Sequence, residues 1–259
     1  AHAVEGRGAA PALTAAGASL SYAELDRQSN QLANYLNASG LGPGSMVAVQ
    51  RGASFDVVIA MLAALKLGGS YVLIDGAAPV QRQSWTIRNA GARAVLGRAP
   101  GAARLPGLAA GTLEPGAGAH LNAPVQRASA AIDPQALAAL AYGTAYPCGD
   151  AAVAAGFSHA SLLHAASAGQ GDAAHLLDRF KGIDGAWPGL WRDLLCGMAV
   201  ELDGIDHDAG EPPVLPLVLA RAHASEFYVM QRGDLVPVGT IGELLVGGPV
   251  QVSLLQGAS

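Results

Sequence analysis

Lysine, cysteine and aromatic residues are all scarce in this chain. Its 259 residues include two lysines (Lys66 and Lys181), two cysteines (Cys148 and Cys196) and only 5% aromatic side chains. Two cysteines outside any C-x-x-C pair exclude a disulfide scaffold, so we expect a cytoplasmic protein. With 54 alanines beside so few aromatic residues, the core must be built mainly from alanine, leucine and valine.

Positive charge and long apolar runs are also lacking. Fifteen basic residues face 20 acidic ones, for a net charge of −5, and no window is rich in lysine and arginine. This balance argues against nucleic acid as a partner. The best apolar run, residues 57–65, is stopped by Lys66, so no membrane span is expected. The start, Ala-His-Ala, has no charged n-region or long apolar stretch, so we expect no secretory signal, and from the missing Met we expect a piece of a longer protein.

Strand and helix patterns alternate in the first hundred residues. Ser21 and Glu24 have the spacing of a capping box, which predicts a helix that ends at Gly40. Short apolar runs and helical patterns follow in turn: a strand at 46–49, a helix at 54–67, a strand at 71–74, a helix at 80–90 and a strand at 94–96. This alternation predicts an α/β domain.

The later chain is less regular. Residues 97–129 are rich in glycine, alanine and proline and predict a surface excursion or a flexible connection. We expect a strand at 137–142 and helices at 161–168 and 189–195. Residues 213–259 alternate short β-rich runs with proline and glycine, so we divide the chain into an α/β region, 1–212, and a β-rich lobe, 213–259. Trp85, Trp187 and Trp191 are expected to be core or interface anchors.

Several motifs resemble a known family. Residues 20–25 (LSYAEL), 29–33 (SNQLA), 40–44 (GLGPG) and 65–75 (LKLGGSYVLID) resemble, in order and spacing, the first two core motifs of nonribosomal peptide synthetase adenylation domains. Later motifs of the same family are resembled by two further parts of the chain. The first is 183–186 (IDGA) with Trp191 and 194–197, and the second is 236–239 (VPVG) with 242–248 (GELLVGG). The resemblance spans nearly the whole chain and is strongest up to Leu96.

The resemblance implies both a fold and a chemistry. The fold is an α/β N-terminal core with a doubly wound sheet, a β-rich part and a mobile C-terminal subdomain. The chemistry joins a carboxylate to ATP and passes the acyl group to a carrier-protein thiol. It needs a Ser/Thr/Gly loop ending in lysine around the phosphates, acidic residues for Mg²⁺ and the ribose, and a second lysine at the reacting carboxylate.

The phosphate loop is degenerate. Where the family has T-S-G-[ST]-T-G-x-P-K-G, this chain has YGTAYPCGDAA at 142–152. Thr144 and Gly149 remain, but the lysine does not, and Tyr146 and Asp150 stand where a phosphate needs backbone N–H groups and positive charge. Arginine cannot simply replace the missing lysine, because its planar guanidinium group is bulkier and presents its donors in other directions.

Other family motifs are missing too. Only a dozen residues separate Leu202 from Val214, where the family has a long α/β unit ending in N-x-Y-G-P-T-E. The R-G-Y, Y-R-T-G-D and catalytic-lysine segments are absent after Gly248, so we expect the C-terminal subdomain to be absent. Lys66 lies at a helix end, where a cation is favourable, and Lys181 precedes the Ile-Asp segment. We therefore expect a truncated core with no catalytic residue and no cofactor.

Asp184 matches the residue that in this family binds the ammonium group of an amino acid. It could therefore be a remnant of a substrate site, or it could be a helix cap or a relic without a role. Ser158, within GFSHA, could be a nucleophile elbow or, more simply, a helix cap. His159 and His164 lie five apart, off the i,i+4 spacing of metal ligands, and Cys148 and Cys196 add no zinc spacing, so no metal site is expected.

The interpretation that these features favour is a catalytically inactive pseudo-adenylation domain. It would act as a structural spacer or docking platform for neighbouring condensation, carrier or tailoring domains of a synthetase. Two alternatives stay open. One is a ligand-binding or regulatory module that uses the remnant pocket for an amino acid or acyl intermediate. The other is an acyl-adenylating enzyme completed by a second polypeptide.

Overall fold

The structure, a computed structural model, describes residues 6–52, 54–97, 112–113, 119–127, 131–142, 153–167, 187–203, 226–231, 234–235, 243–247 and 252–256. The helices are α1 (Tyr22–Ala38), α2 (Phe55–Lys66), α3 (Val80–Asn89), α4 (His159–Ser167) and α6 (Trp187–Cys196), with a 3₁₀ turn η3 at Ala119–Asn122. The strands are β1 (Pro11–Ala15), β2 (Ala18–Ser21), β3 (Met46–Gln50), β4 (Ser70–Ile74), β5 (Ala94–Leu96), β6 (Thr112–Leu113), β7 (Leu137–Tyr142), β8 (Val153–Ser158), β9 (Val200–Glu201), β10 (Glu226–Gln231), β11 (Asp234–Leu235), β12 (Glu243–Gly247) and β13 (Val252–Gln256).

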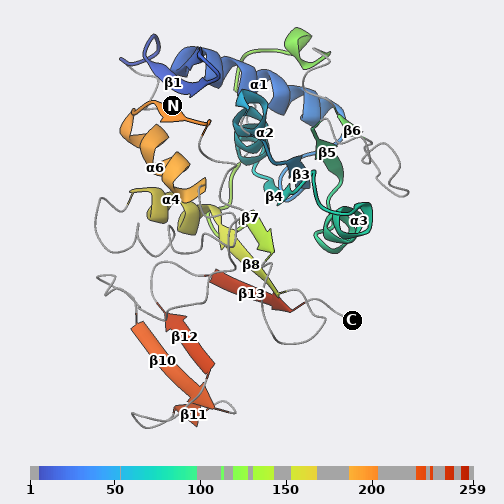
Figure 1. The fold of residues 1–259 in the computed structure, drawn as a ribbon, viewed down its shortest axis with the longest axis vertical. Helices are drawn as coiled ribbons and strands as arrows, with labels where there is room; N and C mark the ends of the chain where they lie inside the picture. Colours follow the sequence, from blue (N-terminus) through green and yellow to red (C-terminus); the bar gives the residue numbers. More distant parts are fainter. Residues whose placement is uncertain are drawn as a thin grey trace.

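A seven-stranded sheet organises the molecule, in the order β13-β8-β7-β4-β3-β5-β6. Strands β7, β4, β3, β5 and β6 run parallel, whereas β8 and β13 are antiparallel to their neighbours. Figure 1 shows this sheet in the upper part and the separate three-stranded sheet β11-β10-β12 below it. The predicted α/β class is therefore confirmed.

The first βαβ unit follows the sequence signals closely. The capping box at Ser21 and Glu24 is formed, with the Ser21 N–H donating to Glu24 Oε2 at 2.9 Å. Gly68 has φ +70° and ends the turn after α2, a conformation that glycine adopts without strain. At Gly69 a Cβ atom would lie 2.6 Å from the Ser45 carbonyl oxygen, so only glycine fits at this position, where the turn leads into β4.

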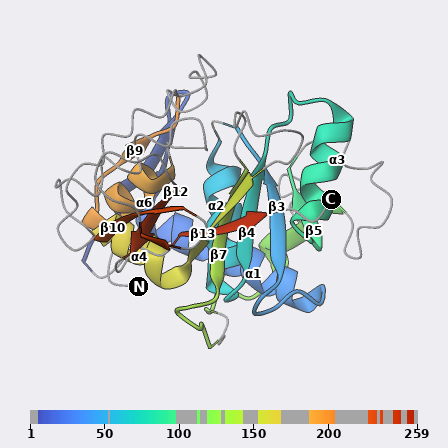
Figure 2. The ribbon, with the colours of Figure 1, turned by 90° about the horizontal axis from the view of Figure 1, so that it is seen from below.

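The two faces of the large sheet bury separate apolar clusters. Alternate residues Val47 and Val49 of β3 face a cluster shared with α1, α2 and α6, whereas Met46 and Ala48 face a cluster with Ile87 of α3. Figure 2 shows α4 and α6 on the β7 side and α3 beside β5. Helices thus cover both faces, which is the doubly wound arrangement.

Three strands carry weaker local signals. β1 and β2 form a hairpin whose two turn residues, Ala16 and Gly17, have φ of +48° and +76°. The Ala16 N–H donates to the Asp203 carboxylate at 2.8 and 2.9 Å, which holds this turn against the chain after β9. β13 pairs with β8, far away in sequence. The predicted boundary between residues 212 and 213 lies outside the described residues.

The predicted surface excursion, residues 97–129, is described in part. Residues 119–127 run along α1, where Gln31 Nε2 donates to the carbonyl of Leu121 at 2.5 Å and Asn34 Nδ2 donates to that of Pro124 at 2.6 Å. Leu121 remains about half exposed. None of the helices in the described part of the chain has the length and apolar character needed to cross a bilayer.

Candidate functional site

The carboxyl edge of the parallel strands is the natural place for a site. In open α/β sheets, ligands bind outside the carboxyl ends of the strands. β7 ends at Tyr142 on this edge, directly before the degenerate phosphate loop, and β3 and β4 end beside it at Gln50 and Ile74. Asp75 follows β4 and is exposed, and its Oδ1 accepts the Ala77 N–H at 2.8 Å. This carboxylate therefore shapes a turn.

Gln50 forms a wedge between two glycines at this edge. A Cβ atom on Gly76 would lie 2.1 Å from Gln50 Nε2, and one on Gly97 would lie 2.5 Å from Gln50 Cβ. Gln50 Oε1 is buried and has no hydrogen-bond partner among the described residues. Sequence reasoning missed this wedge, although both glycines directly follow the predicted strands by one or two residues. The packing leaves no room for a larger side chain beside Gln50.

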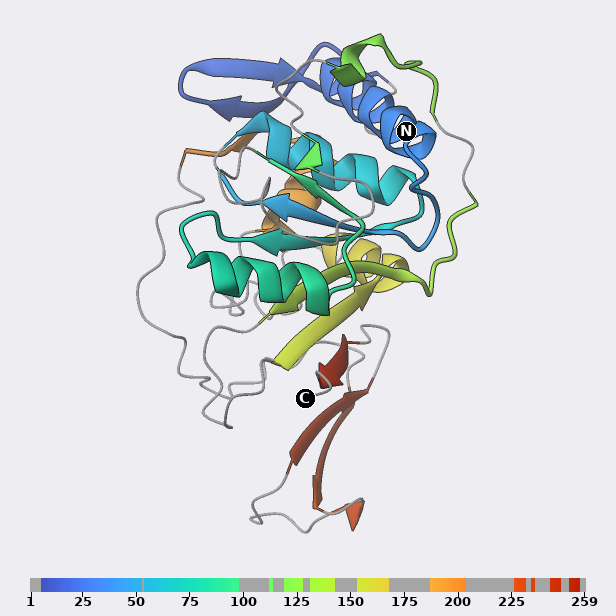
Figure 3. The same ribbon diagram turned by 90° about the vertical axis from the view of Figure 1, so that its right-hand side faces the viewer.

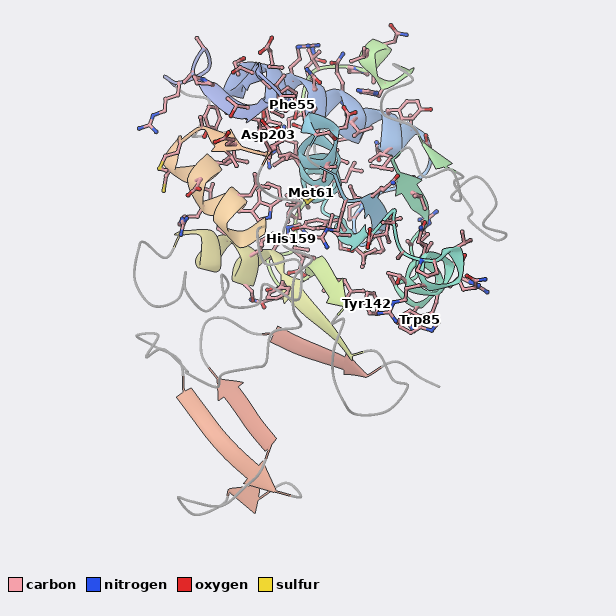
Figure 4. All side chains as sticks on the ribbon, in the orientation of Figure 1. Phe55, Met61, Trp85, Tyr142, His159 and Asp203 are labelled. Carbon is pink, nitrogen blue, oxygen red and sulfur yellow. The ribbon has the colours of Figure 1, made fainter. Side chains whose placement is uncertain are left out.

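Tyr142 is fixed by an aromatic and polar cluster on α3. Its hydroxyl donates to Asn89 Oδ1 at 2.6 Å, and its ring meets Trp85 edge-on, with 5.4 Å between ring centroids. The Arg82 guanidinium lies 5.1 Å from the Trp85 ring centroid. Burial raises the pKa of Tyr142, while the charge of Arg82 opposes that shift. These contacts hold the last residue of β7 against α3 (Figure 4).

The residues of the predicted remnant site lie in segments outside those that the structure describes. Asp184, Thr144 and Gly149 lie outside the described residues, as do Tyr146, Asp150, Cys148 and Lys181. The side chains of His164 and Trp187 are likewise outside the described part. The remnant substrate-binding role of Asp184 stays a prediction.

Ser158 caps a helix. It lies where β8 meets α4, and its Oγ accepts the Ser161 N–H at 3.1 Å and lies 3.0 Å from Ser161 Oγ. His159 Nε2 lies instead 3.0 Å from the carbonyl oxygen of Gly69, and burial lowers its pKa. A nucleophilic serine needs a base within hydrogen-bond reach. The cap interpretation of Ser158 is therefore confirmed, and the neighbouring histidine serves to join α4 to the turn before β4.

Lys66 joins the two motifs that carry the resemblance. Its Nζ donates to Asp26 Oδ1 at 2.8 Å, Ser29 Oγ at 2.7 Å and Asn30 Oδ1 at 2.7 Å, and lies 3.1 Å from the Asp26 carbonyl oxygen. The side chain is only 15% exposed. Burial lowers the pKa of Lys66, while the hydrogen bond and charge of Asp26 oppose that shift. Sequence reasoning gave Lys66 a helix-end role, whereas its principal partners are on α1.

Motif aromatic residues hold α6 in the same way. Trp191 Nε1 donates to the Tyr71 hydroxyl at 3.1 Å, and the two rings pack at 52°. The Tyr22 hydroxyl lies 2.9 Å from the carbonyl oxygens of both Leu194 and Met198. Trp191 is 6% exposed, so its predicted role as a core anchor is confirmed.

The family implies Mg²⁺ beside the nucleotide, held by acidic residues. Among residues that the structure describes, no three His, Cys, Asp or Glu side chains come together as a metal site. At the carboxyl edge, Asp75 carries a carboxylate, but it is engaged by the Ala77 N–H. The described residues of this edge therefore form no cluster of acidic side chains that could hold a magnesium ion.

Comparison with known proteins agrees with these features. A family model described as AMP-binding enzyme matches residues 1–142. Surfactin synthase subunit 3 of Bacillus subtilis (strain 168) is 40% identical over 87 residues, which are 34% of this chain and 7% of that protein. Gramicidin S synthase 2 of Brevibacillus brevis is 43% identical over 77 residues, 30% of this chain and 2% of that protein. The matched stretch thus spans a small part of these relatives.

Solved structures share the fold. Apo MatB from Rhodopseudomonas palustris superposes with a TM-score of 0.66 at 18% identity, over 94% of this chain and 68% of that chain. The nonribosomal peptide synthetase FmoA3 superposes with a TM-score of 0.63 at 21% identity, over 77% of this chain and 22% of that chain. With more than half of its length matched by the family model, this chain belongs to the AMP-binding enzyme family.

Proposed function

We propose that this chain is a catalytically silent adenylation domain that serves as a structural spacer and docking platform for neighbouring synthetase domains. The observation that carries the proposal is the use of the motif residues in packing. Lys66 of α2 donates to Ser29 and Asn30 of α1. Tyr22 and Tyr71 hold α6. These residues maintain a fold without contributing to a reaction.

The sequence of the loop after β7 supports the same proposal. Charge on the phosphates must be neutralised by a cation or by backbone N–H groups in a low-dielectric site. Residues 143–152 contain no lysine or arginine and one aspartate, Asp150. The ammonium of Lys66 is already surrounded by oxygen atoms of Asp26, Ser29 and Asn30. The proposal includes the cytoplasmic setting that the cysteine content favours.

Adenylation can be measured directly by ATP–pyrophosphate exchange with a panel of amino and keto acids. We expect exchange at the level of the enzyme-free blank, and no ATP binding by calorimetry at millimolar nucleotide. An adenylation domain of measured activity, assayed in parallel, is the positive control. Exchange above the blank with any acid of the panel would contradict catalytic silence.

The platform role is tested in the intact synthetase that carries the chain. Trp191→Ala should disrupt the packing of α6 and lower product formation, because the platform depends on the folded core. Asp184→Ala and Thr144→Ala should leave product formation unchanged. If Asp184→Ala lowers product formation while the melting temperature stays the same, the remnant-pocket module is the better account.

A further inference from the structure

The surface of α3 differs in charge from the rest of the molecule. Between Asp75 and Glu114 the sequence contains five arginines (82, 88, 93, 98 and 104) and no aspartate or glutamate, although the whole chain has a net charge of −5. Arg82, Arg88 and Arg93 are exposed. No ion pair joins any of these three to an acidic side chain within the described ranges. Their charges are therefore available to a partner.

An ordered aromatic pair lies among these arginines. Trp85 and Tyr142 are both partly exposed and fix each other edge-on. Arg82 lies over the Trp85 ring, and Val80, at the start of the helix, is 51% exposed. Figure 4 shows Trp85 and Tyr142 side by side below α3. Tryptophan, tyrosine and arginine are the residues that dominate binding energy at protein interfaces, especially when they are held in place before binding.

In the part of the chain that the structure describes, Trp85 and Tyr142 are only partly buried by their neighbours. α3 packs on the sheet through Ile87, on the face opposite to α1 and α2. Figure 3 shows α3 on the outside of the sheet, with α1 and α2 on the other side. Val80, Arg82 and Arg88 point away from that buried side, because all three are exposed.

We propose that the α3 surface, formed by Val80, Arg82, Trp85, Arg88 and Tyr142, docks an acidic segment of a neighbouring synthetase domain. Charge complementarity with the arginines steers this segment, and an apolar side chain of the segment packs against Trp85. Nucleic acid is the less favourable occupant, since the acidic charge of the remaining chain repels phosphates. The inference rests on the proposed platform function and gives it a location.

Site-specific photo-crosslinking in the intact synthetase tests the surface. Gln81 is exposed beside Arg82, and replacing it with p-benzoylphenylalanine places the crosslinker on the α3 surface. The same replacement at Asn37, exposed on α1, is the control on the opposite face. We expect crosslinking at position 81 to a peptide rich in aspartate and glutamate from another domain, identified by mass spectrometry, and none above background at position 37.

Charge reversal gives the matched comparison. Arg82→Glu in the crosslinker background should lower the yield about tenfold, as loss of an interface arginine does. Arg127→Glu makes the same change in charge at an exposed arginine on residues 119–127 and should leave the yield unchanged. Melting temperatures of both variants confirm that the fold is intact.

Several outcomes would overturn the docking surface. These are equal crosslinking at positions 81 and 37, capture of a peptide without acidic residues, capture of nucleic acid, or equal loss in the two charge-reversal variants. Pyrophosphate exchange measured on the same preparation keeps the two proposals apart. Exchange activity contradicts catalytic silence alone, whereas absent crosslinking without exchange contradicts the α3 surface alone.

Discussion

The two faces of the large sheet are held together by different kinds of contact. On one face, polar and aromatic side chains join segments far apart in sequence, as Lys66 of α2 does with α1 and Trp191 of α6 does with Tyr71. On the other face, α3 meets Tyr142 of β7 in a partly exposed cluster, in which Asn89 accepts a hydrogen bond from the Tyr142 hydroxyl, Trp85 packs edge-on against its ring, and Arg82 stays exposed. The first arrangement secures the fold, and the second leaves a surface free for other contacts.

Replacing a tryptophan on each face gives the largest expected difference. Trp191→Ala should cost about 3–5 kcal/mol of unfolding free energy, because it removes a buried side chain and leaves a cavity. Trp85→Ala should cost about 1–2 kcal/mol, from one edge-on ring contact and one cation–π contact at a partly exposed site. Urea unfolding followed by circular dichroism measures both. Equal losses would show that the α3 cluster is as much a part of the core as α6.

Removing a buried cation is the next largest change. Lys66→Met should cost about 2–3 kcal/mol, because Asp26, Ser29 and Asn30 lose a shared donor and the Asp26 side chain, 37% exposed, is only partly solvated. Arg192→Met is the control, since Arg192 pairs with its sequence neighbour Asp193 and both side chains are about a quarter exposed, and it should change the free energy by less than about 1 kcal/mol.

The double variant Lys66→Met with Asp26→Asn provides the second check. Removing the charge of Asp26 should recover part of the loss, as expected for coupled partners. If the two single losses simply add, the contact between α1 and α2 does not depend on this ion pair.

The Gln50 wedge allows a finer test on the α3 face. Gly97→Ala should cost about 1–3 kcal/mol and Gly76→Ala about 1 kcal/mol, because both place a methyl group against Gln50. Gln50→Ala should rescue Gly76→Ala, whose nearest atom is the amide nitrogen. It should not rescue Gly97→Ala, since the Cβ of residue 50, 2.5 Å away, remains. Rescue of both, measured by urea unfolding, would contradict this packing.

Local patterns predicted the parallel part of the fold well. The capping box at Ser21, the glycines after α2 and the alternation of β3, α2 and β4 are signals that a few neighbouring residues carry by themselves. The pairing of β13 with β8 could not be predicted, because an apolar strand pattern indicates that a strand exists and not which strand it joins. The hairpin at Ala16 and Gly17 was missed because its turn lacks the Asn-Gly or Asp-Gly pair.

For the candidate site, the sequence alone could predict only that the loop after β7 lacks a positive charge. The absence of lysine from residues 143–152 can be read directly from the sequence. The contacts of Tyr142 with Trp85 and Asn89 join residues more than fifty positions apart, and no spacing rule predicts such a meeting. Likewise, Lys66 at a helix end fitted a helix-dipole explanation, and only the crossing of α1 over α2 showed its oxygen partners.

The smallest expected effect is a pH dependence that comes from the α1 side of the sheet. Burial lowers the pKa of both His120, beside α1, and His159, at the start of α4, below their ordinary value of 6.5. At pH values well above 6.5, both histidines are neutral in the folded and the unfolded chain. As the pH falls through 6.5, the unfolded chain takes up protons first, so the unfolding free energy decreases until the pH passes the folded pKa values. Each histidine contributes a slope below about 1.4 kcal/mol per pH unit.

Urea unfolding at pH 7.5, 6.5 and 5.5 should show this decrease in the wild type, and a smaller one when His120→Gln and His159→Gln are combined. Trp85→Ala, on the other face, should shift the whole curve without changing its slope. An equal slope in the double histidine variant would mean that other groups dominate acid sensitivity, and that the α1 side is no more sensitive to acid than the α3 side.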